Sequence, residues 1–330
     1  MRFAIIGCGE AGNRRAAAIA LARGAEVAVC VDAVAERAEQ LAAAHAARAT
    51  TDWRTAIASD DVDAVVIATT NNTHAPIGIG AAEAGKHILC ERPLARNPSE
   101  AEQMVAAARE NNVRLKTGFS LRYNPVVVKA REIIDQGRIG RIVFLRGRTG
   151  RGSYAARPPD WVVDFELSGG GTLLDNGMDL LDLCRFVIGD FQWVQGYSAT
   201  LVWPIEPCED NAFAVLTTAD GRAALIHSSW ADWQGYLSLD ISGTDGYIRL
   251  DLDNAVVTLG SRPGTAGAGL EEAMDLSREP DRSLSTEVEE LVSAIAEGRE
   301  PLGGGHDGLE ALVLAHAIYR SSDEKAAIRV

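Results

Sequence analysis

The stretch that decides the fold is FAIIGCGEAG, residues 3–12. Four apolar residues typical of a buried strand lead into glycines spaced GxGxxG, and an alanine-rich segment of helical composition follows over residues 11–23. In such a unit the first glycine allows a tight turn, and the second lets a phosphate approach the backbone. The third allows close packing of helix on strand. The unpaired N–H groups and positive dipole of the helix start also favour phosphate.

Asp32 is the second element of this motif. It stands 20 residues after Gly12, at the end of the next predicted strand, residues 27–31. A carboxylate at this position accepts hydrogen bonds from the ribose hydroxyls of a dinucleotide and repels a 2′-phosphate. The motif therefore predicts an NAD site and makes NADP the less favoured cofactor. The residues of this unit expected at the cofactor are Gly7, Gly9, Glu10, Ala11, Gly12 and Asp32.

The pattern of strands and helices changes near residue 120. Residues 1–120 alternate between strand and helix patterns, which indicates a parallel sheet covered on both faces. Later strand-like segments follow one another with few helices between them, as expected of a mostly antiparallel open sheet. We predict an α/β protein with a doubly wound Rossmann domain over 1–120 and an α+β substrate-binding and oligomerisation domain over 121–330. Local expectations are a helix over 35–48, a loop over 261–284 and a capping box at Thr286–Glu289.

Composition narrows the class of protein. The net charge of −14 argues against a nucleic-acid partner, which usually needs a basic face. No apolar run approaches the roughly 20 residues of a membrane-spanning helix, and the first apolar run is too short for a signal peptide. The five cysteines are widely spaced and form no CxxC pair, which predicts reduced thiols and no metal site. We therefore expect a cytoplasmic protein without nucleic-acid or membrane partners.

Three further segments resemble the Gfo/Idh/MocA family, that of glucose–fructose oxidoreductase and inositol dehydrogenase. They are ATTNNTH (68–74), GKHILCERPL (85–94) and GGGTLLDNGMDLLD (169–182); the segment GFSLRYNP (118–125) is also similar to the family. The resemblance implies a Rossmann domain followed by an open-sheet domain used for oligomer contacts, in a homodimer or homotetramer. It also implies transfer of a hydride between the nicotinamide cofactor and a hydroxyl or carbonyl group of a sugar, sugar acid or cyclitol.

The same resemblance assigns roles residue by residue. Asn71 and His74 would lie near the nicotinamide ribose, and Thr69 and Glu91 beside the cofactor. Asp175 would orient the substrate from the start of its helix. The expected substrate contacts are Arg122, Tyr123, Trp161 and Asn176.

Two positions depart from the family pattern: Arg92 replaces the lysine of the EKP motif, and Asp179 replaces the usual histidine of the GGG segment. Arginine is a poor base because its pKa stays above about 12. Arg92 would therefore polarise a substrate oxygen while Asp179 or Asp175 takes the proton. The spacing of Asp175, Asp179 and Asp182 predicts one acidic helix face, whose repulsion Arg92 would offset. Tyr154 is an alternative acid.

These replacements leave three functions open. The leading hypothesis is an NAD(H)-dependent dehydrogenase or reductase. The second is a lyase, epimerase or glycosidase that retains NAD and uses transient oxidation, as some members of the family do, with no net NADH. The third is a non-catalytic nucleotide-binding regulator, which the loss of the family's lysine and histidine favours.

Overall fold

The computed structural model describes residues 1–152, 158–261 and 271–330, so Tyr154 lies outside the described residues. The chain forms two compact units. Unit 1 comprises Met1–Ser120 and Arg282–Leu312, and unit 2 comprises Leu121–Asp281 and Val313–Val330. The sequence-based division at residue 120 assigned everything beyond it to the second domain. In the structure, 282–312 instead returns to the first unit.

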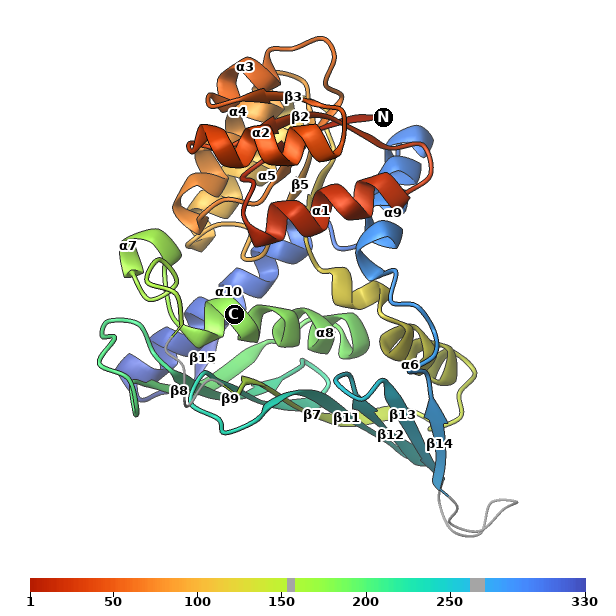
Figure 1. The fold of residues 1–330 in the computed structure, drawn as a ribbon. Helices are drawn as coiled ribbons and strands as arrows, with labels where there is room; N and C mark the ends of the chain where they lie inside the picture. Colours follow the sequence, from red (N-terminus) through yellow and green to blue (C-terminus); the bar gives the residue numbers. More distant parts are fainter. Residues whose placement is uncertain (153–157, 262–270) are drawn as a thin grey trace. The chain divides into compact units, whose positions relative to one another are not determined.

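Unit 1 is built on a six-stranded parallel sheet in the order β3-β2-β1-β4-β5-β6. Figure 1 labels β2, β3 and β5 of this sheet. Its strands are β1 (Arg2–Ile6), β2 (Glu26–Val31), β3 (Arg48–Thr50), β4 (Ala64–Ile67), β5 (His87–Cys90) and β6 (Leu115–Thr117). Its helices are α1 (Glu10–Leu21), α2 (Ala35–Ala44), α3 (Trp53–Ile57), η1 (Asn71–Thr73), α4 (His74–Glu83), α5 (Pro98–Glu110) and α9 (Ser283–Glu297). The strand order reverses between β1 and β4, and sheets of this kind bind ligands beyond the carboxyl ends of the strands at that point. The predicted Rossmann fold is confirmed.

Helix α9 belongs to unit 1 because its apolar stripe completes the core of that unit. Val288 and Leu291 are fully buried in one cluster with Phe3 and Ile19. The predicted capping box at Thr286–Glu289 is wrong, because α9 begins one turn earlier, at Ser283. The Thr286 amide already bonds the Arg282 carbonyl, which places Thr286 inside the helix.

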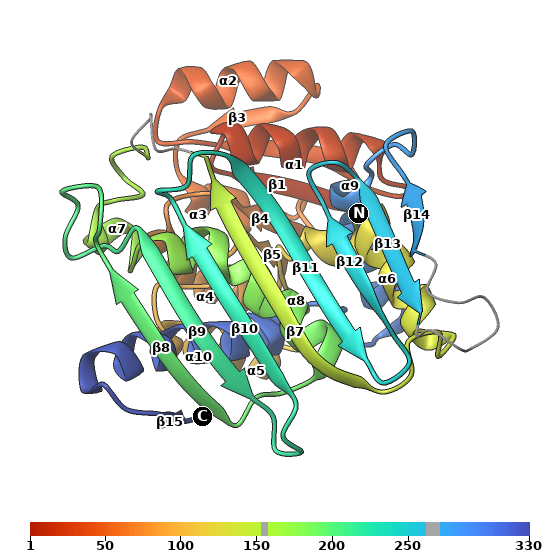
Figure 2. The same cartoon turned by 90° about the horizontal axis from the view of Figure 1, so that it is seen from below.

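Unit 2 is built on a nine-stranded sheet in the order β14-β13-β12-β11-β7-β10-β9-β8-β15 (Figure 2). Among the described strands, only β7 and β10 pair in parallel, so the predicted mostly antiparallel sheet is confirmed. The strands are β7 (Ile142–Arg151), β8 (Trp193–Ala199), β9 (Asn211–Thr217), β10 (Ala223–Ser229), β11 (Gly235–Gly243), β12 (Gly246–Asp251), β13 (Val256–Ser261), β14 (Glu271–Asp275) and β15 (Ile328–Arg329). The helices are η2 (Ser120–Tyr123), α6 (Pro125–Asp135), α7 (Phe165–Ser168), η3 (Leu173–Gly177) and α8 (Met178–Ile188), while α10 (Gly305–Glu324) is divided between the units.

Two segments differ from the sequence-based expectation. The segment predicted as a loop contains β14, a polar edge strand whose pairing with β13 uses backbone groups and needs no apolar pattern. The predicted helix 35–48 ends at Ala44, and Arg48–Thr50 forms β3, which is too short to show a strand period. In the described residues, no helix is long and apolar enough to cross a membrane.

Candidate functional site

The glycine-rich turn lies at the carboxyl end of β1, where the sheet order reverses. Gly7 has φ +97°, and a Cβ there would overlap the Ala68 carbonyl oxygen. A Cβ on Gly12 would overlap the Gly7 carbonyl oxygen. These two glycines are therefore required by the protein's own packing, the first for backbone conformation and the second for the close approach of α1 to β1.

Gly9 is different, because nothing in unit 1 explains the absence of a side chain. Its φ of −74° suits any residue, and a Cβ there would meet no atom within 4 Å in the part of the chain that the structure describes. Gly9 is the N-cap of α1, so the space beside it adjoins the unpaired N–H groups of the first turn, at Glu10 and Ala11. The turn thus keeps open a cradle that fits a pyrophosphate.

Asp32 supports the same turn. Its Oδ2 accepts a hydrogen bond from the Cys8 amide at 2.8 Å, and its Oδ1 accepts one from the Val34 amide at 2.9 Å. Each oxygen keeps a further acceptor site, and the side chain is half-buried. Asp32 therefore orients the glycine turn and can still receive ribose hydroxyls, which fits NAD.

Next along the sheet, the segment after β4 contains Thr69, Asn71 in η1 and His74 at the start of α4. Asn71 and His74 are buried. His74 Nδ1 lies 2.9 Å from the Pro93 carbonyl oxygen and Nε2 lies 3.1 Å from that of Thr69, while the Thr69 hydroxyl accepts from Thr73 at 2.7 Å. Burial lowers the pKa of His74. His74 thus links the loops that follow β4 and β5, and its ring nitrogens are already engaged by the protein.

Glu91 and Arg92 follow β5. Glu91 Oε1 accepts from Arg15 Nε at 2.5 Å, and the same guanidinium pairs with Glu287. Burial alone would raise the pKa of Glu91, but the charges of Arg15 and then Arg92 hold it below its usual value. Arg92 is half-buried, and its peptide bond to Pro93 is cis. Glu91 is thereby fixed as a carboxylate that anchors the start of the loop bearing Arg92.

Arg15 and Glu287 are structural partners that sequence reasoning missed. Both side chains are almost wholly buried, and burial raises the pKa of Glu287 although Arg15 partly offsets the rise. Glu287 Oε1 has no hydrogen-bond partner in the described residues. The two residues are 272 positions apart, so no local pattern links them.

In unit 2, Asp175 lies in η3, a single π-helical turn. Its carboxylate holds Arg151 Nη2 at 2.9 and 2.8 Å and accepts from Trp230 Nε1 at 3.0 Å. Arg151 Nε also donates to Asn176 Oδ1 at 3.0 Å. Turns of this kind are frequent at functional sites because they redirect side chains. Arg151 and Trp230 were not predicted as site residues, since both stand far from the GGG segment in sequence.

The three aspartates of the GGG segment do not form one acidic face. Asp175 lies in the π-turn, whereas Asp179 is half-buried in the first turn of α8 and Asp182 is 1% exposed. The predicted spacing assumed an uninterrupted α-helix, and the π-turn breaks it. The Asp182 carboxylate accepts hydrogen bonds from Arg122 Nε at 2.8 Å and from Arg122 Nη2 at 2.5 Å.

The expected substrate residues therefore have different surroundings within unit 2. Arg122 is 5% exposed and bound in that ion pair, with its guanidinium 5.0 Å from the Phe186 ring centroid. Tyr123 is half-buried, and Trp161 is 40% exposed. Arg122 is thus built to hold η2 against α8, and direct contact of Arg122 with a substrate stays a prediction.

Glu209 is a further buried acid that supports η3. Its Oε2 accepts from the Gly171 amide at 2.9 Å, and its Oε1 accepts from the Leu173 amide at 2.8 Å and the Tyr319 hydroxyl at 3.0 Å. Burial raises its pKa to about 7 against the opposing effect of these bonds. Glu209 thus caps the turn that carries Asp175 and Asn176.

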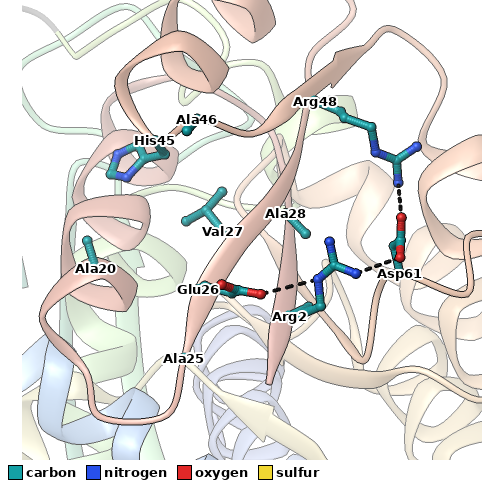
Figure 3. A pocket seen from close by; sticks show the side chains of 10 residues that line it. All are labelled: Arg2, Ala20, Ala25, Glu26, Val27, Ala28, His45, Ala46, Arg48 and Asp61. Atoms are coloured by element: carbon teal, nitrogen blue, oxygen red, sulfur yellow. Dashed lines mark hydrogen bonds and ion pairs between the residues drawn. The ribbon is translucent and has the colours of Figure 1, made fainter.

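A groove of about 500 Å³ in unit 1 lies away from this chemistry, at the amino ends of the strands (Figure 3). Its charges are paired among themselves: Arg2 lies 3.2 Å from Glu26 and 2.5 Å from Asp61, and Arg48 lies 3.7 Å from Asp61. The glycine turn stands at the opposite end of β1, so this groove is not the nucleotide site. Among the described residues, no group of three or more His, Cys, Asp or Glu could hold a metal ion.

Comparison with known proteins agrees with both units. The model of an oxidoreductase family with an NAD-binding Rossmann fold matches residues 1–119, and a Gfo/Idh/MocA C-terminal domain model matches 127–249. Inositol 2-dehydrogenase of Rhizobium meliloti is 29% identical over 338 residues, which cover 100% of this chain and 99% of that protein. Levoglucosan dehydrogenase of Pseudarthrobacter phenanthrenivorans is 37% identical over 196 residues, covering 57% of this chain and 50% of that protein.

A solved structure shows the same fold over the whole chain. Levoglucosan dehydrogenase in complex with NADH and levoglucosan has a TM-score of 0.92 and 26% sequence identity, and the match covers 100% of this chain and 99% of that chain. With the glycine turn, Asp32 and the two family models, the chain therefore belongs to the Gfo/Idh/MocA family of NAD-binding oxidoreductases.

Proposed function

We propose that this oxidoreductase transfers a hydride between NAD(H) and a hydroxyl or carbonyl group of a sugar or cyclitol. The observation that carries the proposal is that similarity to an inositol dehydrogenase spans the full chain, including the unit that bears Asp175 and Asp179. NAD supplies the hydride acceptor or donor when bound. Gly9, Asp32 and the start of α1 would hold it, with Thr69, Asn71, His74 and Glu91 forming or supporting the adjoining loops.

The protein's own residues divide the remaining work. We assign Arg92 to polarise the substrate oxygen, because its guanidinium donates hydrogen bonds and cannot act as a base. We assign Asp179 to take the hydroxyl proton on a carboxylate oxygen during oxidation and to return it during reduction. Asp175 orients the substrate, since its own carboxylate is already engaged by Arg151 and Trp230.

The test is NADH formation with a panel of myo-inositol, levoglucosan, D-xylose, D-gluconate and D-glucuronate. We expect turnover by the wild type of at least one of these compounds. The variant Arg92→Lys/Asp179→His, which restores the family's residues, should also turn over the same compound. Activity confined to the restored variant would refute the proposal and favour a regulator that binds NAD without turnover.

The same panel separates the NAD-retaining hypothesis. An enzyme that uses transient oxidation consumes the sugar without accumulating NADH. Product analysis by chromatography beside the absorbance assay therefore distinguishes it from a dehydrogenase. Sugar loss without NADH would contradict the proposed net hydride transfer.

We also propose a homo-oligomer formed through the open face of the unit 2 sheet. Directly paired residues share a face, and Tyr197, Phe213, Val215 and Leu225 are each exposed by 38% or more on the face opposite the buried Leu216. Figure 2 shows this sheet along its whole width. An exposed cluster of large apolar side chains on a sheet face favours an interface on a protein in water.

The oligomer is tested by light scattering on Leu225→Glu. We expect the wild type to be a dimer or tetramer and the variant to dissociate, because a charge would be buried in the apolar interface. Leu21→Glu is the matched control, since Leu21 is 76% exposed on α1 in unit 1. A monomeric wild type would contradict the proposal.

A cytoplasmic location completes the proposal. All five cysteines are free and buried in the structure. Free buried thiols are typical of reducing compartments, where disulfides do not persist. Localisation of a tagged protein by cell fractionation tests this point.

A further inference from the structure

The side-chain amide of Asn176 has an orientation fixed by its neighbour. Its Oδ1 accepts a hydrogen bond from Arg151 Nε at 3.0 Å. A guanidinium offers donors only, so the amide atom that faces it must be the oxygen. The usual ambiguity between amide oxygen and nitrogen is therefore resolved here. The Nδ2 group, with its two hydrogens, is the end of the amide that Arg151 does not engage.

That Nδ2 group is a buried donor without an acceptor. Asn176 is 8% exposed, and Nδ2 has no hydrogen-bond partner in the part of the chain that the structure describes. Buried N–H groups are nearly always bonded, because the water lost on burial must be replaced by another acceptor. An unpaired donor beside Asp175 is therefore a position that a ligand oxygen would complete.

The acceptors around Asn176 are already used. The Asp175 carboxylate holds Arg151 Nη2 and Trp230 Nε1, and the Asn176 oxygen holds Arg151 Nε. Arg151 bonds through Nε and Nη2, so within the described residues its Nη1 group is not engaged, and its side chain is 42% exposed. The cluster of Arg151, Asp175 and Asn176 therefore has more hydrogen-bond donors than acceptors, and the unused donors lie on Arg151 and Asn176.

The charge of the cluster decides which acceptor fits. Arg151 and Asp175 form an ion pair, so their charges cancel. An anionic group would gain no net attraction from this pair, whereas a hydroxyl, ring or acetal oxygen requires only donors. We propose that Arg151 and Asn176 together bind an uncharged oxygen of the substrate, and that they set the substrate class to neutral sugars and cyclitols and against sugar acids. This inference rests on the proposed function, because it concerns the substrate of the same reaction.

The variant Asn176→Asp tests the donor by changing one atom. The new carboxylate still accepts from Arg151 Nε, but the Nδ2 donor becomes an acceptor. We expect NADH affinity to stay near the wild-type value and affinity for the neutral sugar to fall at least about tenfold. Asn176→Ala also removes the donor but adds no charge, and it should lower the affinity for the same sugar.

Asn124→Asp is the matched control for the same one-atom change in the same unit. Among the described residues, the Asn124 side chain bonds through its Oδ1, which accepts from the Val126 amide at 2.9 Å as the N-cap of α6. Aspartate serves equally at this position. Sugar affinity is measured by calorimetry on the NADH-loaded protein with levoglucosan, myo-inositol, D-xylose, D-gluconate and D-glucuronate, so that turnover is not required. Asn124→Asp should bind as the wild type does.

Each outcome decides the inference. It is overturned if the wild type binds no neutral sugar in the panel, if both Asn176 variants bind as tightly as the wild type, or if the sugar acids bind more tightly than the neutral compounds. Weakened binding in both variants supports it. If that weakening is seen while the wild type turns over none of the sugars it binds, the inference stands and the proposed dehydrogenase fails.

Discussion

The substitution Gly9→Ala separates the needs of the fold from the needs of the cofactor. Gly9 has a backbone conformation open to alanine, and the added Cβ would meet no atom of the described residues within 4 Å. Two small effects on folding oppose each other. Alanine stabilises by about 0.4–1 kcal/mol by restricting the unfolded chain. It costs a similar amount at an N-cap position. We therefore expect the free energy of unfolding to change by less than about 1 kcal/mol.

The effect on NADH binding should be much larger. The new methyl group would stand where a pyrophosphate meets the backbone at the start of α1 and would push it away from the first-turn N–H groups. Each hydrogen bond to a charged group that is lost costs about 1.5–3 kcal/mol. Since about 1.4 kcal/mol corresponds to a tenfold change in Kd, the loss of one such bond raises the Kd for NADH roughly ten- to hundredfold.

Fluorescence titration with NADH and thermal unfolding measure the two effects on the same sample. Gly12→Ala is the contrasting variant, because its Cβ would overlap the Gly7 carbonyl oxygen. It should lose both stability and NADH binding. Unchanged NADH affinity in Gly9→Ala would refute the cradle. A loss of stability in Gly9→Ala equal to that in Gly12→Ala would refute the geometry on which the argument stands.

Three other perturbations test supporting residues. Asp32→Ala should lower the affinity for NADH at least about tenfold, because it removes the acceptor for both the ribose hydroxyls and the Cys8 amide. An unchanged affinity in the NADH titration would show that Asp32 does not belong to the site. Glu287→Ala removes one of the two carboxylates that pair with the buried Arg15 and should lower the free energy of unfolding by about 1.5–3 kcal/mol in calorimetry. The double variant Arg15→Met/Glu287→Leu should cost less than the sum of its single variants. Burial raises the pKa of Glu209 to about 7 in the folded chain, above the roughly 4.3 of an unfolded glutamate, so the folded state holds this proton more tightly. The contribution of Glu209 to the free energy of unfolding is therefore complete below the unfolded pKa and is lost as the pH rises from about 4 to about 7, by roughly 3–4 kcal/mol. Glu209→Gln should flatten the dependence of the free energy of unfolding on pH over this range, whatever the absolute stability of the variant.

The nucleotide half of the site follows closely from the sequence because its determinants are local. The strand, the glycine turn and α1 are consecutive, and Asp32 comes at the end of the very next strand. Backbone requirements of this kind leave a direct trace in residue identity, as Gly7 and Gly12 show. The alternation of strand patterns likewise predicts the two sheets, although not the edge strand β14, whose pairing needs no apolar residues.

The supporting interactions could not be predicted because they join distant segments. Arg15 meets Glu287 across 272 positions, and Arg122 meets Asp182 across 60. The packing of α9 in unit 1 could not be predicted for the same reason, since the apolar stripe on α9 predicts a buried face but not the unit that buries it. The π-turn around Asp175 could not be predicted from the sequence either, because its residues are also compatible with an α-helix.

These distant partners bear directly on which aspartate moves the proton. A carboxylate that takes a proton gives up its ion pair, so a partnered aspartate is a costly base. Asp182 is bound through two bonds to Arg122, and Asp175 is bound to Arg151. Asp179 also has an interaction of its own, so the absence of a partner does not select it. Its proposed role rests on its position in the GGG segment, where the resemblance described above implies a histidine. We therefore expect Asp179→Asn to abolish hydride transfer while leaving the Kd for NADH within about twofold, since a residue outside unit 1 makes no predicted bond to the cofactor. Retained turnover in Asp179→Asn would return the role to Asp175, and the pH profile of Arg151→Met would then decide between orientation and proton transfer.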